Sequence, residues 1–134
     1  DLLDGRVVFL GFRDDVAALL PELSLLVHPA RQEPLGRVLL EAAAVGLPVA
    51  ATEVGGTREI FGSDYNDQAS GDSALLVPAN DPEALRAAIL LLASQPETAG
   101  RLGRLARRRA EERFDVRVSA SKLGEEYARV ARGL

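Results

Sequence analysis

The sequence predicts an α/β protein built on a parallel sheet. Short apolar runs rich in Val, Leu and Ala alternate with longer stretches whose apolar residues recur at helical spacing. The short runs are apolar throughout, which is typical of strands covered on both faces. Strand and helix follow each other four times, and this order predicts parallel strands joined by right-handed crossovers. Additional helices close the chain.

Four strands are expected, and each is ended by a glycine, a proline or a polar turn. The first run, RVVFLGF, is β-branched and aromatic and is interrupted by Gly11. The second, LSLLVHP, carries its strand signal from Ser24 to His28 and stops at Pro29. The other two are PVAAT and SALLVP. The four runs cover residues 6–12, 24–28, 48–52 and 73–78.

The helices are marked by capping residues and stop signals. Asp14 or Asp15 can cap a short helix in RDDVAALLPEL, and Gly46 stops the helix that follows EPLG. GGTREIF reads as a Gly-rich turn opening a short helix, and the polar stretch 62–72 reads as a loop. Pro82 stands near the first position of the best-marked helix, which runs from Asn80 onward. Two more helices are expected over 96–114 and 116–134.

Composition favours a single globular domain over residues 1–134. A chain of 134 residues with 47% hydrophobic residues can bury roughly two thirds of its unfolded surface. Cysteine is absent and His28 is the only histidine, so no metal site is expected. The net charge of −4 argues against a nucleic-acid partner. No leader-like or membrane-spanning run is seen, and a cytoplasmic location is the expectation.

One segment concentrates positive charge. Such a run is usually a solvated helix face, and Glu111 and Glu112 interrupt this one. A peripheral contact with acidic lipid is the second interpretation. The residues are Arg101, Arg104, Arg107, Arg108, Arg109 and Arg113.

The stretch EPLGRVLLEAAAVGLPVAATEVGG follows the second expected strand, and parallel sheets bind ligands at the carboxyl ends of their strands. Glu33 and Glu41 lie eight residues apart, about 12 Å of helical rise. The paired carboxylates of glycosidases are about 5 to 9.5 Å apart. Two contacts along one elongated ligand therefore fit better than a proton-transfer pair.

Each glutamate also has an ordinary structural interpretation. Glu41 could accept hydroxyls of a ribose, or it could form a surface pair with Arg37, four residues before it. Glu33 and Pro34 could mark a plain helix start. Alternatively, the turn leaves backbone amides unpaired and aimed at a diphosphate, with Gly36 allowing close approach. These amides belong to Leu35, Gly36, Arg37 and Val38.

The ordered blocks EPLGRVLLEAAAVGLPVAATEVGGTREI and ALLVPANDPEAL resemble the C-terminal, nucleotide-sugar-binding domain of retaining GT-B glycosyltransferases. More narrowly, the chain resembles glycosyltransferase family 4, the glycosyl transferases group 1 family. The resemblance runs from about Arg6 to Phe114 and includes the E-x7-E pattern. It implies a Rossmann-like half of a GT-B fold with extra C-terminal helices.

The resemblance also implies roles for individual residues. Glu33, the catalytic-site residue, would contact hydroxyls of the donor sugar, and Glu41 would bind the nucleotide ribose. Donor-binding positions would include the turn amides, with Pro34 standing where the family usually has Gly in EGFG. GGTREI corresponds to the family's GGxxE block, in which Thr57 and Glu59 are weaker candidates. These donor-binding residues are Pro34, Leu35, Gly36, Arg37, Val38, Glu41 and Thr57.

The implied reaction transfers a sugar from a UDP-, GDP- or ADP-linked donor to an acceptor hydroxyl, without a cofactor. Family members usually place an Arg and a Lys upstream of FLGF, whereas the only lysine here is Lys122. A fragment or isolated donor-binding domain is therefore expected, lacking the N-terminal acceptor domain and inactive alone. Two alternatives stay open: a non-catalytic nucleotide-binding or interaction module, and an unrelated flavodoxin-like protein.

Overall fold

The computed structural model describes residues 5–62 and 72–133. Its sheet has the strand order β1-β2-β3, with β1 at Leu26–His28, β2 at Val49–Thr52 and β3 at Leu75–Val77. Both pairings are parallel, with Val27 opposite Ala50 and Ala51 opposite Leu76. The predicted parallel α/β architecture is confirmed, with three of the four expected strands formed in the described part of the chain.

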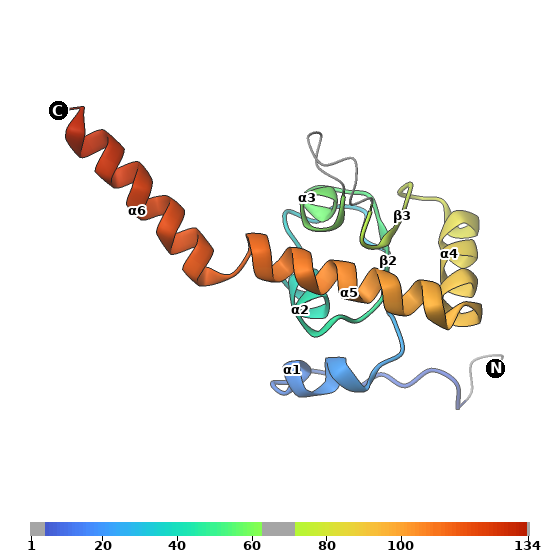
Figure 1. Ribbon diagram of the computed structural model, residues 1–134. Helices are drawn as coiled ribbons and strands as arrows, with labels where there is room; N and C mark the ends of the chain where they lie inside the picture. Colours follow the sequence, from blue (N-terminus) through green and yellow to red (C-terminus); the bar gives the residue numbers. More distant parts are fainter. Residues whose placement is uncertain (1–4, 63–71, 134) are drawn as a thin grey trace.

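The first expected strand, over residues 6–12, is wrong. Residues 7–12 form no strand, and the segment runs beneath the body into α1 (Val16–Leu19) (Figure 1). Its aromatic side chains are open to solvent, with Phe9 94% and Phe12 98% exposed. A β-branched and aromatic run becomes a strand only where it can pair and pack on a half-buried surface. This segment lies on no such surface, so its composition misled the prediction.

The helices form close to the predicted positions. Asp15 is the N-cap residue of α1 as expected, but its carboxylate accepts from Arg13 and caps no helix amide. The short η1 (Leu20–Glu22) continues α1, and α2 (Arg37–Val45) ends at Gly46 as expected. In α4 (Pro82–Ser94), the Asp81 carboxylate accepts a hydrogen bond of 2.9 Å from the amide of Ala84. The remaining helices are α3 (Thr57–Phe61), α5 (Pro96–Arg113) and α6 (Val116–Arg132). The expected loop 62–72 lies mostly outside the described residues.

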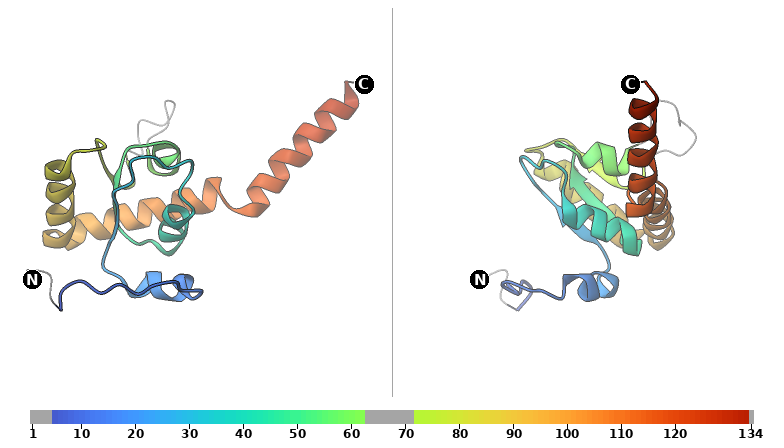
Figure 2. Two further views of the ribbon diagram at one scale, coloured as in Figure 1. Left: turned by 180° about the vertical axis from the view of Figure 1, so that it is seen from behind. Right: turned by 90° about the vertical axis from the view of Figure 1, so that its left-hand side faces the viewer.

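Helices cover both faces of the sheet, and β2 shows why. All four residues of β2 are buried, and the side chains of the first three alternate between two apolar clusters. Val49 and Ala51 join the cluster formed by η1, α2, α3 and α5, whereas Ala50 joins the one formed by α4 and the first half of α5. In Figure 1 and in the left view of Figure 2, α2 and α3 lie on one side of the strands and α4 lies on the other. This double covering explains why the strands read as continuous apolar runs.

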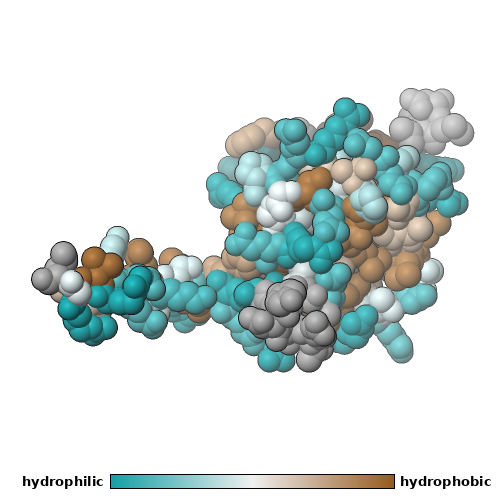
Figure 3. Space-filling view, turned by 90° about the horizontal axis from the view of Figure 1, so that it is seen from above, coloured by the Kyte–Doolittle hydropathy of each residue, from teal (hydrophilic) through white to brown (hydrophobic). Residues whose placement is uncertain are grey.

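The last helix, α6, leaves the body (Figures 1 and 2). None of its residues is buried, and its surface is mostly hydrophilic with scattered apolar side chains (Figure 3). Its N-cap residue is Asp115, whose carboxylate accepts a hydrogen bond of 2.7 Å from the amide of Arg117. No helix in the described ranges is both long and apolar enough to cross a membrane.

The positive segment on α5 is largely paired with protein groups. Arg107 and Arg108 each bond to the glutamate four residues later, at 2.9 and 2.8 Å. Arg109 reaches back to α3, donating to the carbonyl oxygens of Ile60 and Glu59 at 2.8 and 3.3 Å. These contacts favour the solvated helix face. The lipid contact stays a prediction.

Candidate functional site

The loop after β1 and the turn after β2 meet at the carboxyl edge of the sheet. Gly55 has a φ of +49°, and a Cβ there would come closer than 3.0 Å to the carbonyl of Glu33. The Gly56 amide donates to the Pro34 carbonyl at 3.0 Å. The motifs EPLG and GGT are therefore packed backbone against backbone, which a side chain at position 55 would prevent.

A second glycine shapes the start of α2. Gly36 is the N-cap residue with φ +78°, and a Cβ there would lie 2.7 Å from Leu39 Cδ1. Its carbonyl accepts the amides of Leu39 and Leu40 at 2.9 and 3.3 Å. Within residues 5–62 and 72–133, no hydrogen bond uses the four amides that precede Leu39 in this turn. They are the amides of Leu35, Gly36, Arg37 and Val38, as the sequence predicts.

Glu33 borders a surface hollow of about 490 Å³, called here the Glu33 hollow. The hollow lies between the loop after β1 and the turn after β2. Its lining residues are Arg31, Gln32, Glu33, Pro34, Val54 and Gly55. Glu33 is half-buried, and its carboxylate Oε2 is 3.6 Å from Nε2 of His28.

Glu41 borders a different hollow, of about 290 Å³, between α2 and the carboxyl end of α5. This Glu41 hollow has an apolar floor, and three carboxylates line it. Its residues are Leu40, Glu41, Ala44, Ala110, Glu111, Phe114 and Asp115. No ion pair joins Glu41 to Arg37 in the described part of the chain, so the predicted surface pair does not form. The two glutamates therefore line separate hollows.

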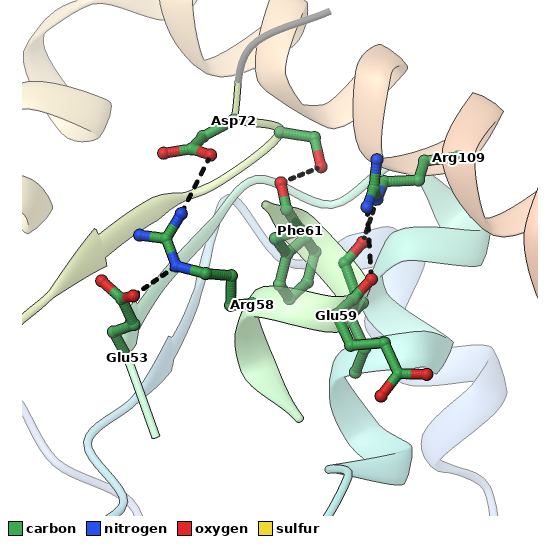
Figure 4. A network of polar contacts seen from close by, with 8 residues as sticks. Glu53, Arg58, Glu59, Phe61, Asp72 and Arg109 are labelled. Carbon is green, nitrogen blue, oxygen red and sulfur yellow. Dashed lines mark hydrogen bonds and ion pairs between the residues drawn. The ribbon is translucent and has the colours of Figure 1, made fainter. Parts of the chain in front are cut away.

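Thr57 and Glu59, the weaker candidates, have structural positions on α3. Thr57 is fully buried, and its hydroxyl donates to the Val54 carbonyl at 2.7 Å. Glu59 is exposed, and its carboxylate points away from Arg109, which binds the Glu59 backbone instead (Figure 4). A ligand contact by Thr57 stays a prediction, and in this conformation its hydroxyl closes the GGT turn.

An ion-pair network is built around Arg58 of α3. Arg58 binds the Glu53 carboxylate and lies 3.9 Å from Asp72 (Figure 4). The side-chain hydrogen bond from Arg58 lowers the pKa of Glu53 below its ordinary value. Ser73 donates to the Phe61 carbonyl at 3.1 Å and thereby ties β3 to the end of α3. This network holds α3 in place and involves none of the predicted donor contacts.

Arg31 is a further candidate site residue that was not predicted from the sequence. Arg31 lines the Glu33 hollow and also a second hollow of about 190 Å³ at the carboxyl ends of the strands. Its guanidinium makes no hydrogen bond or ion pair within residues 5–62 and 72–133. Its position in the loop after β1 could have identified it, because parallel sheets bind ligands at the carboxyl ends of their strands. The described residues contain no group of three or more His, Asp or Glu side chains placed to hold a metal ion.

A family model and two curated relatives match this chain. The family model described as "Glycosyl transferases group 1" matches residues 1–95. The chain is 33% identical over 112 residues to the N-acetyl-alpha-D-glucosaminyl L-malate synthase of Bacillus anthracis, covering 84% of this chain and 28% of that protein. It is 32% identical over 127 residues to the glycogen synthase of Mycobacterium tuberculosis, covering 93% of this chain and 29% of that protein.

Two solved structures also match this chain. Sucrose-phosphate synthase from Thermosynechococcus elongatus matches with a TM-score of 0.82 and 31% identity, over 99% of this chain and 32% of that one. Anabaena HepE in complex with UDP-glucose matches with a TM-score of 0.72 and 27% identity, over 98% of this chain and 34% of that one. The fold is that of GT-B glycosyltransferases. The chain spans less than a third of the length of the two curated relatives.

Proposed function

The chain belongs to the glycosyl transferases group 1 family, and we propose that it is the donor-binding part of a family 4 enzyme. In this proposal the enzyme moves a sugar from a nucleotide-diphosphate donor to an acceptor hydroxyl with retention at the anomeric carbon. Support comes from HepE, which was solved with UDP and with UDP-glucose. The acceptor-binding domain is proposed to lie in the part of the relatives that this chain does not cover.

One observation carries the proposal: the α2 turn presents amides that make no hydrogen bond within the described residues, and it follows directly on the Glu33 hollow, while Glu41 borders a second hollow further along α2. A nucleotide sugar is elongated, with hydroxyl-rich sugars at both ends and a diphosphate in the middle. Glu33 would accept hydroxyls of the donor sugar, and Glu41 those of the ribose. The separate hollows suit two contacts with one extended ligand and do not suit a shared proton.

The turn would stabilise the diphosphate, which becomes the leaving group. Amides at the N-terminus of a helix point their hydrogens outward, and the helix dipole adds partial positive charge there. Donors fixed in position before reaction are the usual source of such leaving-group stabilisation. Arg31 and Arg37 are exposed cations beside this turn. Neither forms an ion pair with the residues that the structure describes, so both guanidinium groups would be available to the diphosphate.

Calorimetric titration with UDP, GDP, ADP and one sugar conjugate of each tests the donor site. We expect saturable binding of one nucleotide and its conjugate. Substituting Glu41→Ala should weaken nucleotide binding by about 1 to 3 kcal/mol, the usual loss for a hydrogen bond to a charged group. The control is Glu83→Ala, which removes an exposed carboxylate from the first turn of α4 and should leave affinity unchanged. A folded chain that binds none of these nucleotides would refute the proposal.

We also propose that the isolated chain does not catalyse transfer and requires no cofactor. Its single lysine, Lys122, lies on α6, which projects away from the sheet (Figure 1). A transfer and donor-hydrolysis assay with the chain alone should therefore give no turnover. Measurable turnover would contradict this part of the proposal and would also exclude the alternative of a non-catalytic module.

A further inference from the structure

His28 stands at the end of β1, five residues before Glu33, and its ring faces that carboxylate. Nε2 of the imidazole is 3.6 Å from Oε2 of Glu33, with 18% of the His28 side chain and 26% of the Glu33 side chain exposed. This separation is within ion-pair range and longer than a hydrogen bond. Catalytic contacts are often long in ligand-free proteins and shorten when the substrate binds. The pair is therefore arranged to make a hydrogen bond after a small movement.

The second ring nitrogen of His28 indicates where the hydrogen lies. Nδ1 is buried and has no hydrogen-bond partner in the part of the chain that the structure describes. A neutral imidazole carries hydrogen on one nitrogen only. Either tautomer leaves Nδ1 without a partner among the described residues, but hydrogen on Nδ1 would also turn the lone pair of Nε2 toward the Glu33 carboxylate, which costs further free energy. The surroundings therefore favour hydrogen on Nε2, the nitrogen that faces Glu33.

The backbone on both sides of Glu33 is fixed by other contacts. Thr52 donates to the carbonyl of Ala30 at 2.6 Å, and the Gly56 amide donates to the carbonyl of Pro34 at 3.0 Å. Among the described residues, His28 is the only polar contact of the Glu33 carboxylate. The main chain thus places Glu33 at the hollow, while its carboxylate direction depends on His28.

We propose that His28 is a positioning residue that aims the Glu33 carboxylate at the donor sugar. This inference rests on the proposed function, and it adds a residue that the sequence analysis did not include in the site. The proposal predicts which part of the donor is bound less tightly when His28 is changed. Losing the Nε2 donor should affect the contact with the sugar and leave the ribose and diphosphate contacts intact.

A pair of His28 variants separates a positioning role from a packing role. His28→Phe keeps a planar ring and removes the donor, whereas His28→Gln keeps an N–H donor near the position of Nε2. For each variant, the Kd of UDP-glucose is divided by the Kd of UDP, with the GDP-mannose and GDP pair or the ADP-glucose and ADP pair used if the wild type selects it. We expect His28→Phe to raise this ratio about tenfold, with Glu33→Gln giving a similar rise. His28→Gln should stay close to the wild type.

The same ratio can overturn the proposal. If His28→Phe leaves it within about twofold of the wild type, or weakens both ligands equally, His28 has only a packing role. The double variant His28→Phe/Glu33→Gln should show no further rise beyond either single variant, because both changes remove the same contact. A multiplied effect would show that the two residues act independently and would also overturn the inference.

The imidazole itself offers a readout that does not need the donor. The chain has one histidine, so its ring ¹⁵N signals in NMR are unambiguous. We expect hydrogen on Nε2 and a shift of the Nε2 signal in Glu33→Gln, with no shift in the control Glu83→Ala. Unchanged ring signals in Glu33→Gln would overturn the contact. If the wild type binds no nucleotide but the Nε2 signal does shift, the proposed function fails while the His28–Glu33 contact stands.

Discussion

Substituting Gly103→Ala should destabilise the fold although alanine is the better helix former. Gly103 is buried in the middle of α5, facing the end of α2. A Cβ at this position would lie closer than 3.0 Å to the carbonyl oxygen of Gly46. That oxygen belongs to the main chain and cannot rotate away as a flexible side chain could. The two helices must therefore separate for the methyl group to fit.

The magnitude follows from two opposing terms. Alanine in place of glycine favours a helix interior by about 1 kcal/mol. Separating α5 from α2 by about 1 Å loosens the shared core and costs about 1 to 3 kcal/mol, with the upper part of that range expected for a clash with backbone. The difference is a net loss of about 1 to 2 kcal/mol in the free energy of unfolding. Leu102 and Ala106, which are buried beside Gly103, would lose contacts.

Urea unfolding followed by circular dichroism measures this loss, and α5 provides its own control. At Gly100, one turn earlier, the nearest atom to an added Cβ is Nη1 of Arg104 at 3.2 Å, the end of a flexible side chain. Gly100→Ala should therefore stabilise the protein by up to about 1 kcal/mol. If Gly103→Ala is as stable as Gly100→Ala, the close approach of α5 to Gly46 is wrong.

Three further predictions concern turns and caps. Gly55→Ala should lower the free energy of unfolding, measured in urea, by about 2 to 4 kcal/mol, because alanine would adopt an unfavourable positive φ and its Cβ would clash with the Glu33 carbonyl. An unfolding midpoint equal to that of the wild type would contradict the packing of EPLG on GGT. Asp81→Ala should cost about 1 kcal/mol in the same assay by removing the α4 cap, and a neutral result would show that the cap contributes nothing. At Asp115, the side-chain hydrogen bond from Arg117, followed by its amide, lowers the pKa from 3.8 to about 2. The pKa of Asp115 is lower in the folded protein than in the unfolded chain. Its stabilising effect is therefore fully present at pH values above the unfolded-state pKa, and it is lost as the pH falls through the folded-state pKa. The difference in helix signal between wild type and Asp115→Ala should therefore be full at pH above 3.8 and vanish toward about pH 2, whereas a constant difference would refute the cap assignment.

The sequence by itself determined the elements whose signals are local. Asp81 and Pro82 begin α4, and Gly46 ends α2, because capping depends on side chains only a few residues away. The continuous apolar runs around β2 and β3 correctly indicated strands covered on both faces. The turn amides before Leu39 also follow from local geometry, since every helix leaves its first amides unbonded.

Only the tertiary structure decided which of these pieces meet. Residues 7–12 have strand composition, yet a strand requires a neighbouring edge that no local signal can supply. Spacing in the sequence could not show that Glu33 and Glu41 border separate hollows. The Glu41 hollow is completed by residues of α5, and the Glu33 hollow is completed by Val54 and Gly55. The contact of His28 with Glu33 likewise depends on the loop path fixed by Thr52 and Gly56. Local signals are set by adjacent side chains, whereas these arrangements are set by packing between segments distant in the chain.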